Sequence, residues 1–230
     1  MSDIPEIRGA QACVFDAYGT LFDVHAAVGA LKPEIGPEAD RLSQIWRQKQ
    51  LEYSWLRSLM HAHQDLWQLT ADGLDYAMEA TGMADRAELR GKLLDLYRKL
   101  DCYPEVPATL KRLKQAGFTT AILTNAPPHM VDSAVDNAQL APLLDATLSI
   151  EEVGIFKPDP RVYQLACDRL GLAADAICFL SSNAWDVSGA AHFGLQVVWI
   201  NRFGQPRERL PGGPKAVIET LDELPALVGA

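Results

Sequence analysis

The segment VFDAYGTLFD, residues 14–23, contains the end of an apolar run, and that run stops at a carboxylate, Asp16. The chain then turns through Tyr18, Gly19 and Thr20. A short, continuously apolar run is typical of a parallel strand that is covered on both faces. In open α/β sheets, ligands bind outside the carboxyl ends of the strands. The segment therefore predicts a buried parallel strand with a candidate site residue at its end.

Similar apolar runs recur along the chain, and segments with helical character lie between most of them. Several of these segments stop at glycine, which is a common signal just past the end of a helix. The alternation predicts βαβ units and therefore an α/β fold with a parallel sheet. The predicted strands are 11–18, 118–125, 145–150, 176–182 and 195–201; the helices are 106–116, 128–139, 159–170 and 185–193; a loop over 202–216 precedes a short helix near 221–228.

Residues 24–101 break this alternation, because they contain no convincing strand. Their apolar residues recur three and four positions apart, which is typical of amphipathic helices. We therefore expect an all-helical insert directly after the first strand. The predicted division is a catalytic core of residues 1–23 and 102–230 and a helical cap of residues 24–101, with helices near 25–32, 38–62, 66–82 and 85–100.

The composition of the chain excludes some classes of partner. Its 230 residues are 48% hydrophobic and carry a formal net charge of −9, with a pI near 5.0. Such an acidic chain lacks the basic face expected for binding nucleic acid or an anionic membrane. The four cysteines are scattered without a CxxC pair, and neither a signal peptide nor a membrane span is visible. We therefore expect a cytoplasmic protein.

Polar side chains cluster after several of the predicted strands. Because the carboxyl ends of parallel strands meet at one edge of the sheet, we expect these side chains to converge. Lys157 would act as a counter-charge that keeps Asp16 ionised, so that the carboxylate is available as a nucleophile. The converging residues are Asp16 and Thr20, Thr124 and Asn125, Lys157, and Ser181, Ser182, Asn183 and Asp186.

Simpler structural roles remain open for some of these residues. Asp16 is of a type that often caps helices or forms turns. Thr124 and Asn125 are suited to cap the helix that begins at the Pro127-Pro128 pair. Asp186 is predicted in the first turn of its helix, where a negative charge is favourable.

Taken together, these motifs resemble the haloacid dehalogenase superfamily. The resemblance implies a Rossmann-like core with a helical cap inserted after the first strand. Most members are magnesium-dependent phosphatases with a DxD motif, but here Tyr18 stands in place of the second acid. Ser182 and Asn183 stand where metal-binding acids would be needed, so we expect neither a metal nor another cofactor. Tyr18 suggests a reaction whose leaving group needs no proton.

Four longer strings resemble the type II L-2-haloacid dehalogenases of this superfamily: DAYGTLFD, WRQKQLEYSWLRSLM (46–60), FKPDPRVY (156–163) and SSNAWD (181–186). The resemblance implies that Asp16 attacks C2 of a 2-haloacid, and that water then hydrolyses the aspartyl ester. It also implies a homodimer. The resemblance further implies that Asp16 is supported by Lys157, Thr20, Tyr163, Ser181 and Asn183, and that Asp186 activates the water. Arg47 and Asn125 would bind the halide, and Thr124 would bind the substrate carboxylate. The implied wall of the pocket consists of Tyr18, Gln48, Leu51, Leu66 and Trp185.

The sequence departs from the subfamily pattern at two places. Thr124-Asn125-Ala126 replaces the usual Ser-Asn-Gly, and Leu66 stands where phenylalanine is common. These changes concern the range of substrates more than the type of reaction. Two alternative functions are a phosphatase of the same fold and a catalytically silent protein that binds a small carboxylate or a protein partner.

Overall fold

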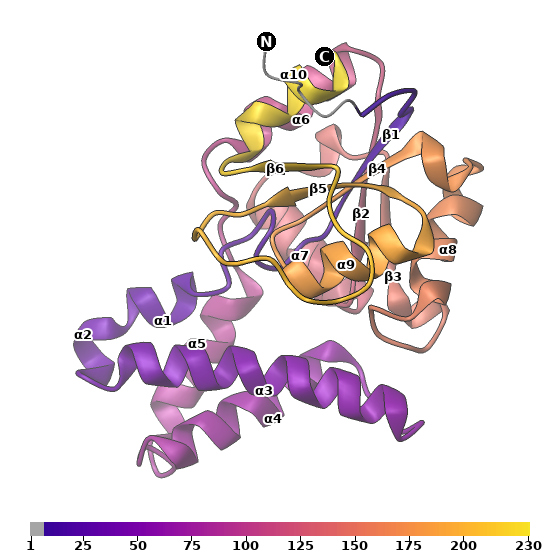
Figure 1. The fold of residues 1–230 in the computed structure, drawn as a ribbon. Helices are drawn as coiled ribbons and strands as arrows, with labels where there is room; N and C mark the ends of the chain where they lie inside the picture. Colours follow the sequence, from indigo (N-terminus) through magenta and orange to yellow (C-terminus); the bar gives the residue numbers. More distant parts are fainter. Residues whose placement is uncertain (1–6) are drawn as a thin grey trace.

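The computed structural model describes residues 7–230 and contains a six-stranded parallel sheet with the order β3-β2-β1-β4-β5-β6 (Figure 1). The strand β1 has β2 on one side and β4 on the other, so the order of the sheet reverses at β1. Ligands of doubly wound sheets bind at such a reversal. The strands are β1 (Ala12–Phe15), β2 (Thr119–Thr124), β3 (Ala146–Ser149), β4 (Ile177–Ser181), β5 (Gln196–Ile200) and β6 (Ala216–Ile218).

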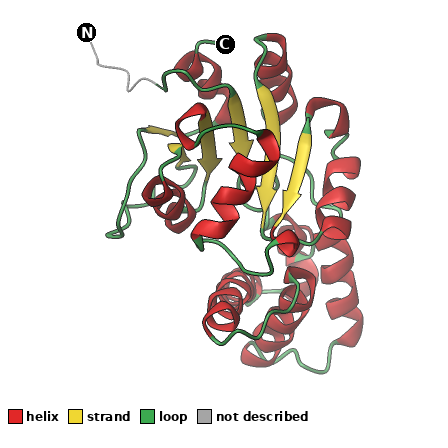
Figure 2. Cartoon of the chain, turned by 90° about the vertical axis from the view of Figure 1, so that its right-hand side faces the viewer, coloured by secondary structure: helices red, strands yellow, loops and turns green. Residues whose placement is uncertain are grey.

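Helices cover both faces of the sheet, as Figure 2 shows. Every residue of β1, β4 and β5 is buried, which explains why these strands read as continuous apolar runs rather than alternating ones. The α/β fold class is confirmed. The helices of the core are α6 (Val106–Gln115), α7 (Pro128–Asn137), α8 (Pro160–Leu170), α9 (Ala184–Phe193) and α10 (Leu224–Val228), with short 3-10 turns at Ala141–Leu143, Ile150–Glu152, Ala174–Ala176 and Leu221–Glu223.

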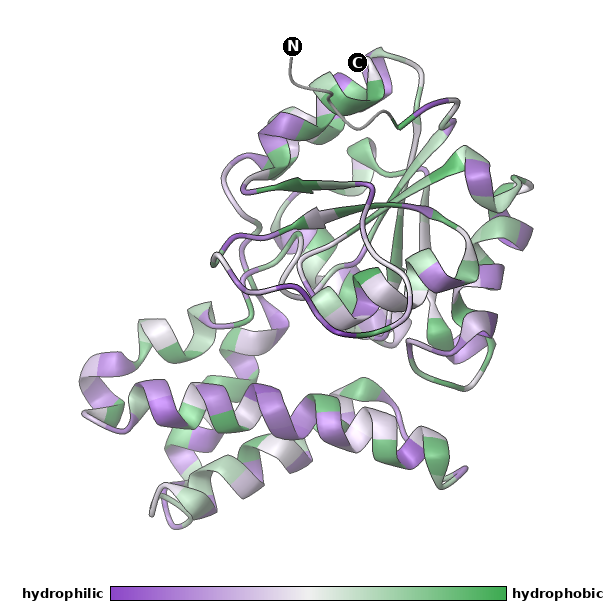
Figure 3. Cartoon of the chain, in the orientation of Figure 1, coloured by the Kyte–Doolittle hydropathy of each residue, from purple (hydrophilic) through white to green (hydrophobic). Residues whose placement is uncertain are grey.

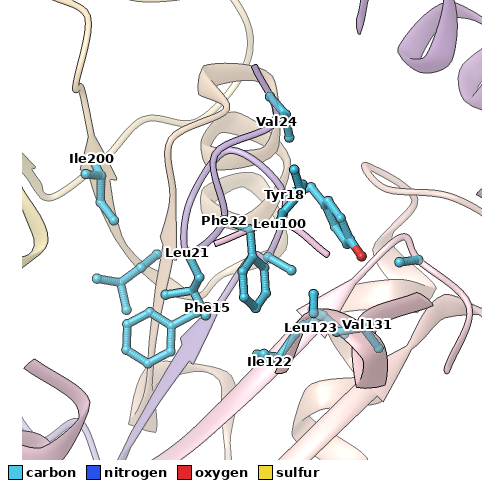
Figure 4. Close-up of a cluster of buried hydrophobic side chains, with 14 of the residues drawn as sticks. Phe15, Tyr18, Leu21, Phe22, Val24, Leu100, Ile122, Leu123, Val131 and Ile200 are labelled. Carbon is cyan, nitrogen blue, oxygen red and sulfur yellow. The ribbon is translucent and has the colours of Figure 1, made fainter. Parts of the chain in front are cut away.

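A cluster of apolar side chains fixes the turn that follows β1 (Figure 4). Leu21 and Phe22 from this turn are completely buried, and they lie among side chains from neighbouring elements. Those neighbours include Phe15 of β1, Ile122 of β2 and Ile200 of β5. Because the turn is anchored on two sides by packing, the polar residues between β1 and Leu21 have a defined position.

Five helices between β1 and α6 form the cap, which lies beyond one end of the sheet in Figure 1. Figure 3 shows mixed hydrophilic and hydrophobic residues along these helices, in contrast to the largely hydrophobic strands. Two linkers join the cap to the core, and they run antiparallel at a bridge between Phe22 and Cys102. The cap helices are α1 (Ala26–Ala30), α2 (Lys32–Ile35), α3 (Ala39–Leu59), α4 (Leu66–Ala80) and α5 (Ala87–Arg98).

The structure corrects some predicted bounds. The loop predicted over 202–216 ends earlier, because Ala216 begins the edge strand β6, which has only three residues and one exposed position. The helix predicted over 25–32 is divided into α1 and α2 at Leu31. The helix predicted over 38–62 ends at Leu59, and His61 has a positive φ of 52° that ends helical geometry. Within residues 7–230, no helix is long and apolar enough to cross a lipid bilayer.

Candidate active site

Asp16 lies directly after β1, at the carboxyl end of the central strands. Its backbone N–H donates to the carbonyl of Leu180 in β4, at an N–O distance of 2.8 Å. Its carboxylate is nearly buried and accepts three hydrogen bonds. Lys157 Nζ lies 3.1 Å from Oδ1, while Thr20 Oγ1 and Asn183 Nδ2 lie 3.0 and 2.9 Å from Oδ2. Both oxygens are therefore oriented by donors.

Lys157 lies between two carboxylates. Its ammonium is buried and lies 3.0 Å from Asp186 Oδ2 as well as 3.1 Å from Asp16 Oδ1. Burial alone would lower the pKa of Lys157, but the two carboxylates outweigh it and raise the pKa above the usual lysine value. The backbone N–H of Lys157 donates to Asn125 Oδ1 at 3.0 Å, so Asn125 holds the loop that carries the lysine.

Asp186, in the first turn of α9, is completely buried. Burial raises the pKa of Asp186, an effect that Lys157 and the hydroxyl of Tyr163 only partly oppose. The Tyr163 hydroxyl donates to Asp186 Oδ1 at 2.7 Å. This approach requires a glycine at position 189, because an added Cβ would lie 2.6 Å from the Tyr163 hydroxyl oxygen. A carboxylate with a raised pKa is a stronger base than an ordinary aspartate.

The segment after β4 orders the other side of Asp16. Thr20 Oγ1 accepts a hydrogen bond from the backbone N–H of Ser182 at 2.9 Å, and Ser181 Oγ accepts one from the backbone N–H of Asn183 at 3.1 Å. The Thr20 hydroxyl hydrogen is thereby directed to Asp16. Ser181 acts on the position of Asn183 rather than on the Asp16 carboxylate itself.

Arg47 brings a cation from the cap helix α3 to this cluster. Its Nη2 donates to Asn183 Oδ1 at 3.1 Å and to the Tyr18 carbonyl at 3.3 Å. Its Nη1 donates to Gln50 Oε1 at 2.7 Å. Because Asn183 also contacts Asp16, one asparagine joins the cap arginine to the carboxylate of the core.

The remaining predicted residues are less directly involved with Asp16. The Tyr18 ring is buried and stacks on Tyr97 with 6.0 Å between the ring centroids, while its hydroxyl donates to the Met130 carbonyl. Burial raises the pKa of Tyr18 well above the usual value, which keeps its proton in place. Thr124 Oγ1 accepts a hydrogen bond from the backbone N–H of Ala126 at 3.1 Å, which is a local turn contact.

The predicted wall residues occupy different environments. Leu66 is buried and Leu51 is half-buried. Trp185 is half-buried and packs edge-on against Trp55, with 5.3 Å between the centroids. Gln48 is exposed and its amide donates to Glu52 on the same helix, so the structure does not bring Gln48 to the Asp16 cluster.

Comparison with known proteins identifies the family. The haloacid dehalogenase-like hydrolase family matches residues 10–194. The chain belongs to this family. It is 49% identical over 218 residues to (S)-2-haloacid dehalogenase 1 of Pseudomonas sp. strain CBS-3, a match that covers 95% of this chain and 96% of the relative.

Solved structures of related dehalogenases share the fold of this family member. A dehalogenase crystal structure at 46% identity matches with a TM-score of 0.95 over 97% of this chain and 99% of the other. The L-2-haloacid dehalogenase from Xanthobacter autotrophicus, with chloropropionic acid covalently bound, matches with a TM-score of 0.88 at 34% identity, over 95% of this chain and 98% of that one. The predicted resemblance to the type II L-2-haloacid dehalogenases is confirmed.

Two polar residues near the site were missed by the sequence analysis. Gln50 lies four positions after Trp46 on the buried side of α3, and this spacing was a usable signal. Arg202 lies two residues after the end of β5, at the same sheet edge as the other polar groups. Its Nη2 donates to the carbonyl of Thr20 at 3.0 Å, while Nη1 contacts Glu105 at 2.6 Å. The strand-end rule that identified Asp16 also applies to Arg202.

Proposed function

We propose that this chain is an (S)-2-haloacid dehalogenase, which hydrolyses short L-2-haloalkanoic acids to D-2-hydroxy acids and halide. The observation that carries the proposal is the nearly buried Asp16 carboxylate, which is paired with Lys157 and oriented by Thr20 and Asn183. Position 18, two residues after Asp16, is a tyrosine and not a second acid that could protonate a leaving group. This suits a leaving group that needs no proton. The relative with covalently bound chloropropionic acid supports a covalent route.

The first step is a displacement at C2 of the substrate. A carboxylate oxygen of Asp16 attacks C2 from the face opposite the halogen, and the new C–O bond forms as the carbon–halogen bond breaks. The halide leaves with the electron pair of that bond, and the configuration at C2 inverts. The Lys157 ammonium, 3.1 Å from Asp16 Oδ1, pairs with the attacking carboxylate and holds it in place.

The second step hydrolyses the ester. Water attacks the carboxyl carbon of the Asp16 ester, and Asp186 accepts the proton of that water. The bond between this carbon and the ester oxygen then breaks, and the departing oxygen takes up a proton to give the 2-hydroxy acid. One halide and one proton are released per turnover. The raised pKa of Asp186, which burial causes, supports its role as the base.

Substrate binding would involve both the cap and the core. Arg47 and Asn125 would bind the leaving halide, since a guanidinium and an amide N–H are suitable donors to an anion. Thr124 and neighbouring backbone N–H groups would bind the substrate carboxylate. Ser181 and Tyr163 would hold Asn183 and Asp186 in place. The proposed wall of the pocket is Tyr18, Leu51, Leu66 and Trp185; Gln48 is left out because it is exposed and its amide contacts Glu52 on its own helix.

We also propose a homodimer in the cytoplasm. The last turn of α3 and the residue after it expose Leu56, Leu59 and Met60, with exposed fractions of 51%, 78% and 71%. Such a group of exposed apolar side chains at one end of a helix supports association with a second copy. The four free cysteines support a reducing compartment.

The experiment that tests the proposed function is halide release from L- and D-2-chloropropionate in the presence of EDTA. We expect chloride from the L-enantiomer only, at a rate that chelation does not change, with D-lactate as the other product. p-Nitrophenyl phosphate with magnesium is run alongside. Magnesium-dependent release of phosphate without chloride would contradict the proposal in favour of a phosphatase. If neither chloride nor phosphate is released, the result would contradict the proposal in favour of a binding protein.

A further inference from the structure

Gln50 is a buried amide inside the cap. Its side chain is 1% exposed, and it lies between Arg47 on its own helix and Thr70 on the neighbouring helix α4. The Tyr97 hydroxyl lies 3.2 Å from Gln50 Nε2 and 3.3 Å from Oε1. A buried amide with partners on all sides has a defined orientation if one of those partners can only accept.

Thr70 settles the orientation of this amide. Its hydroxyl has one hydrogen, which is donated to the carbonyl of Leu66 at 2.7 Å. Thr70 Oγ1 must therefore accept in its 2.6 Å contact with Gln50, and the Gln50 atom there is Nε2. Oε1 then faces Arg47, where it accepts a hydrogen bond from Nη1 at 2.7 Å. Rotating the amide by 180° would place two donors, Nε2 and Arg47 Nη1, against each other.

The contact between Gln50 Oε1 and Arg47 Nη1 also fixes the direction of the second guanidinium nitrogen, Nη2. A guanidinium is planar and rigid, so holding Nη1 determines the direction of Nη2. Nη2 points to Asn183 Oδ1 and to the Tyr18 carbonyl, and Asn183 in turn contacts Asp16. A continuous series of contacts therefore runs from the interior of the cap to the carboxylate.

We propose that Gln50 is a positioning residue that aims Arg47 at the leaving halide. This inference rests on the proposed function, because it assigns Gln50 an effect through the halide site. Without the Gln50 oxygen, Nη1 loses its 2.7 Å acceptor, and the guanidinium is aimed less firmly at the reaction centre. The negative charge that develops on the halide in the displacement step is then less well stabilised.

The dependence of the rate on the halogen separates positioning from a merely structural role. Chloride is a poorer leaving group than bromide, so breaking its bond to carbon relies more on the stabilisation that Arg47 gives. A misdirected Arg47 should slow the chloro substrate more than the bromo substrate. A general loosening of the cap should slow both substrates by the same factor.

The test compares Gln50→Met with Gln50→Glu and with Gln196→Met. Methionine keeps the length of the side chain but removes the oxygen, whereas glutamate keeps an acceptor for Arg47. Gln196 is a second buried glutamine, 3% exposed, whose amide donates to the carbonyls of Arg8 and Asp175 at the opposite end of the sheet. Gln196→Met therefore controls for loss of a buried amide.

Halide release is measured in a single turnover with L-2-chloro- and L-2-bromopropionate, and thermal unfolding is measured for every variant. We expect Gln50→Met to slow chloride release on the order of tenfold to a hundredfold, as for other orienting partners, and bromide release less. Gln50→Glu keeps the acceptor for Arg47 but offers Thr70 no donor, so it should move the ratio of the two rates back toward the wild-type value. Gln196→Met should leave the ratio unchanged.

The outcomes separate this inference from the proposed function. Wild-type protein that releases no halide would overturn the proposed function and the inference with it. Active wild-type protein with an unchanged chloride-to-bromide ratio in Gln50→Met would overturn the inference alone. A change of that ratio in Gln196→Met as large as in Gln50→Met would also overturn it, since the loss of any buried amide would then have the same effect.

Discussion

Lys157 controls the electrostatics of the site at the scale of single residues. Its ammonium is shared by two buried carboxylates: Nζ lies 3.1 Å from Asp16 Oδ1 and 3.0 Å from Asp186 Oδ2. Removing one partner from a buried ion pair costs roughly 3–5 kcal/mol, because the other charge is left without compensation. Lys157 therefore stabilises the fold of the site as well as the position of the Asp16 carboxylate.

The pH dependence of ester hydrolysis follows from these charges. Burial raises the pKa of Asp186, and a base must be deprotonated to act, so the rate should fall on acidification at a higher pH than an ordinary aspartate would give. Burial lowers the pKa of Lys157, but the two carboxylates raise it by more. The loss of activity at alkaline pH, where Lys157 loses its proton, should therefore lie above the usual lysine range. The decay of the ester after a single turnover, measured against pH, gives both limits.

Tyr163→Phe is the matched variant for this pH profile. The Tyr163 hydroxyl donates to Asp186 and lowers its pKa, so removing it should move the acid limit to higher pH. An acid limit that stays in place in Tyr163→Phe, or one at the position of an ordinary aspartate in the wild type, would contradict the role of Asp186 as the base.

At the scale of elements, α3 has two functional faces. Arg47 points from this helix toward the core and Gln50 toward α4, while the carboxyl end of the helix exposes Leu56 and Leu59. The apolar stripe predicted from the sequence identified the helix, but its polar residues are harder to assign. Gln48 and Gln50 are chemically identical and two positions apart. Which of them is buried depends on which side of α3 packs against α4.

The exposed end of α3 gives a prediction about assembly. Leu59→Glu should convert a dimer to a monomer, because a carboxylate would be placed in the apolar interface. Phe203→Glu is the matched control, since Phe203 is also an exposed apolar residue, at 66%, but lies in the loop after β5. Light scattering after gel filtration measures the mass of each variant. A monomeric wild type, or equal effects of both substitutions, would contradict this interface.

At the scale of the whole molecule, much of the fold was predictable from the sequence. Five strands and the helical insert were predicted because buried parallel strands are continuously apolar and amphipathic helices are periodic. The three-residue strand β6 was missed, since Ala216–Ile218 is too short to show a pattern and depends on pairing with β5. The strand-end rule found Asp16, Ser181 and Asp186.

The contacts that the sequence could not predict are those between distant segments. Arg202 reaches the carbonyl of Thr20 only because β5 and the turn after β1 end at the same edge. Gln50 reaches Arg47 and Thr70 only because α3 packs on α4. Such contacts depend on the tertiary structure, so the residues that orient the reacting groups were harder to find than the reacting groups themselves.

The most direct test of the central claim, that Asp16 is the nucleophile, is a single turnover in H₂¹⁸O with enzyme in excess over L-2-chloropropionate. Water that attacks the ester carbonyl leaves its oxygen in the carboxylate of Asp16, so mass spectrometry should find ¹⁸O in the Asp16 peptide and none in the lactate. Asp16→Ala should show neither label nor chloride. Label in the lactate and none in the Asp16 peptide would show that water attacks C2 directly, and would contradict the account.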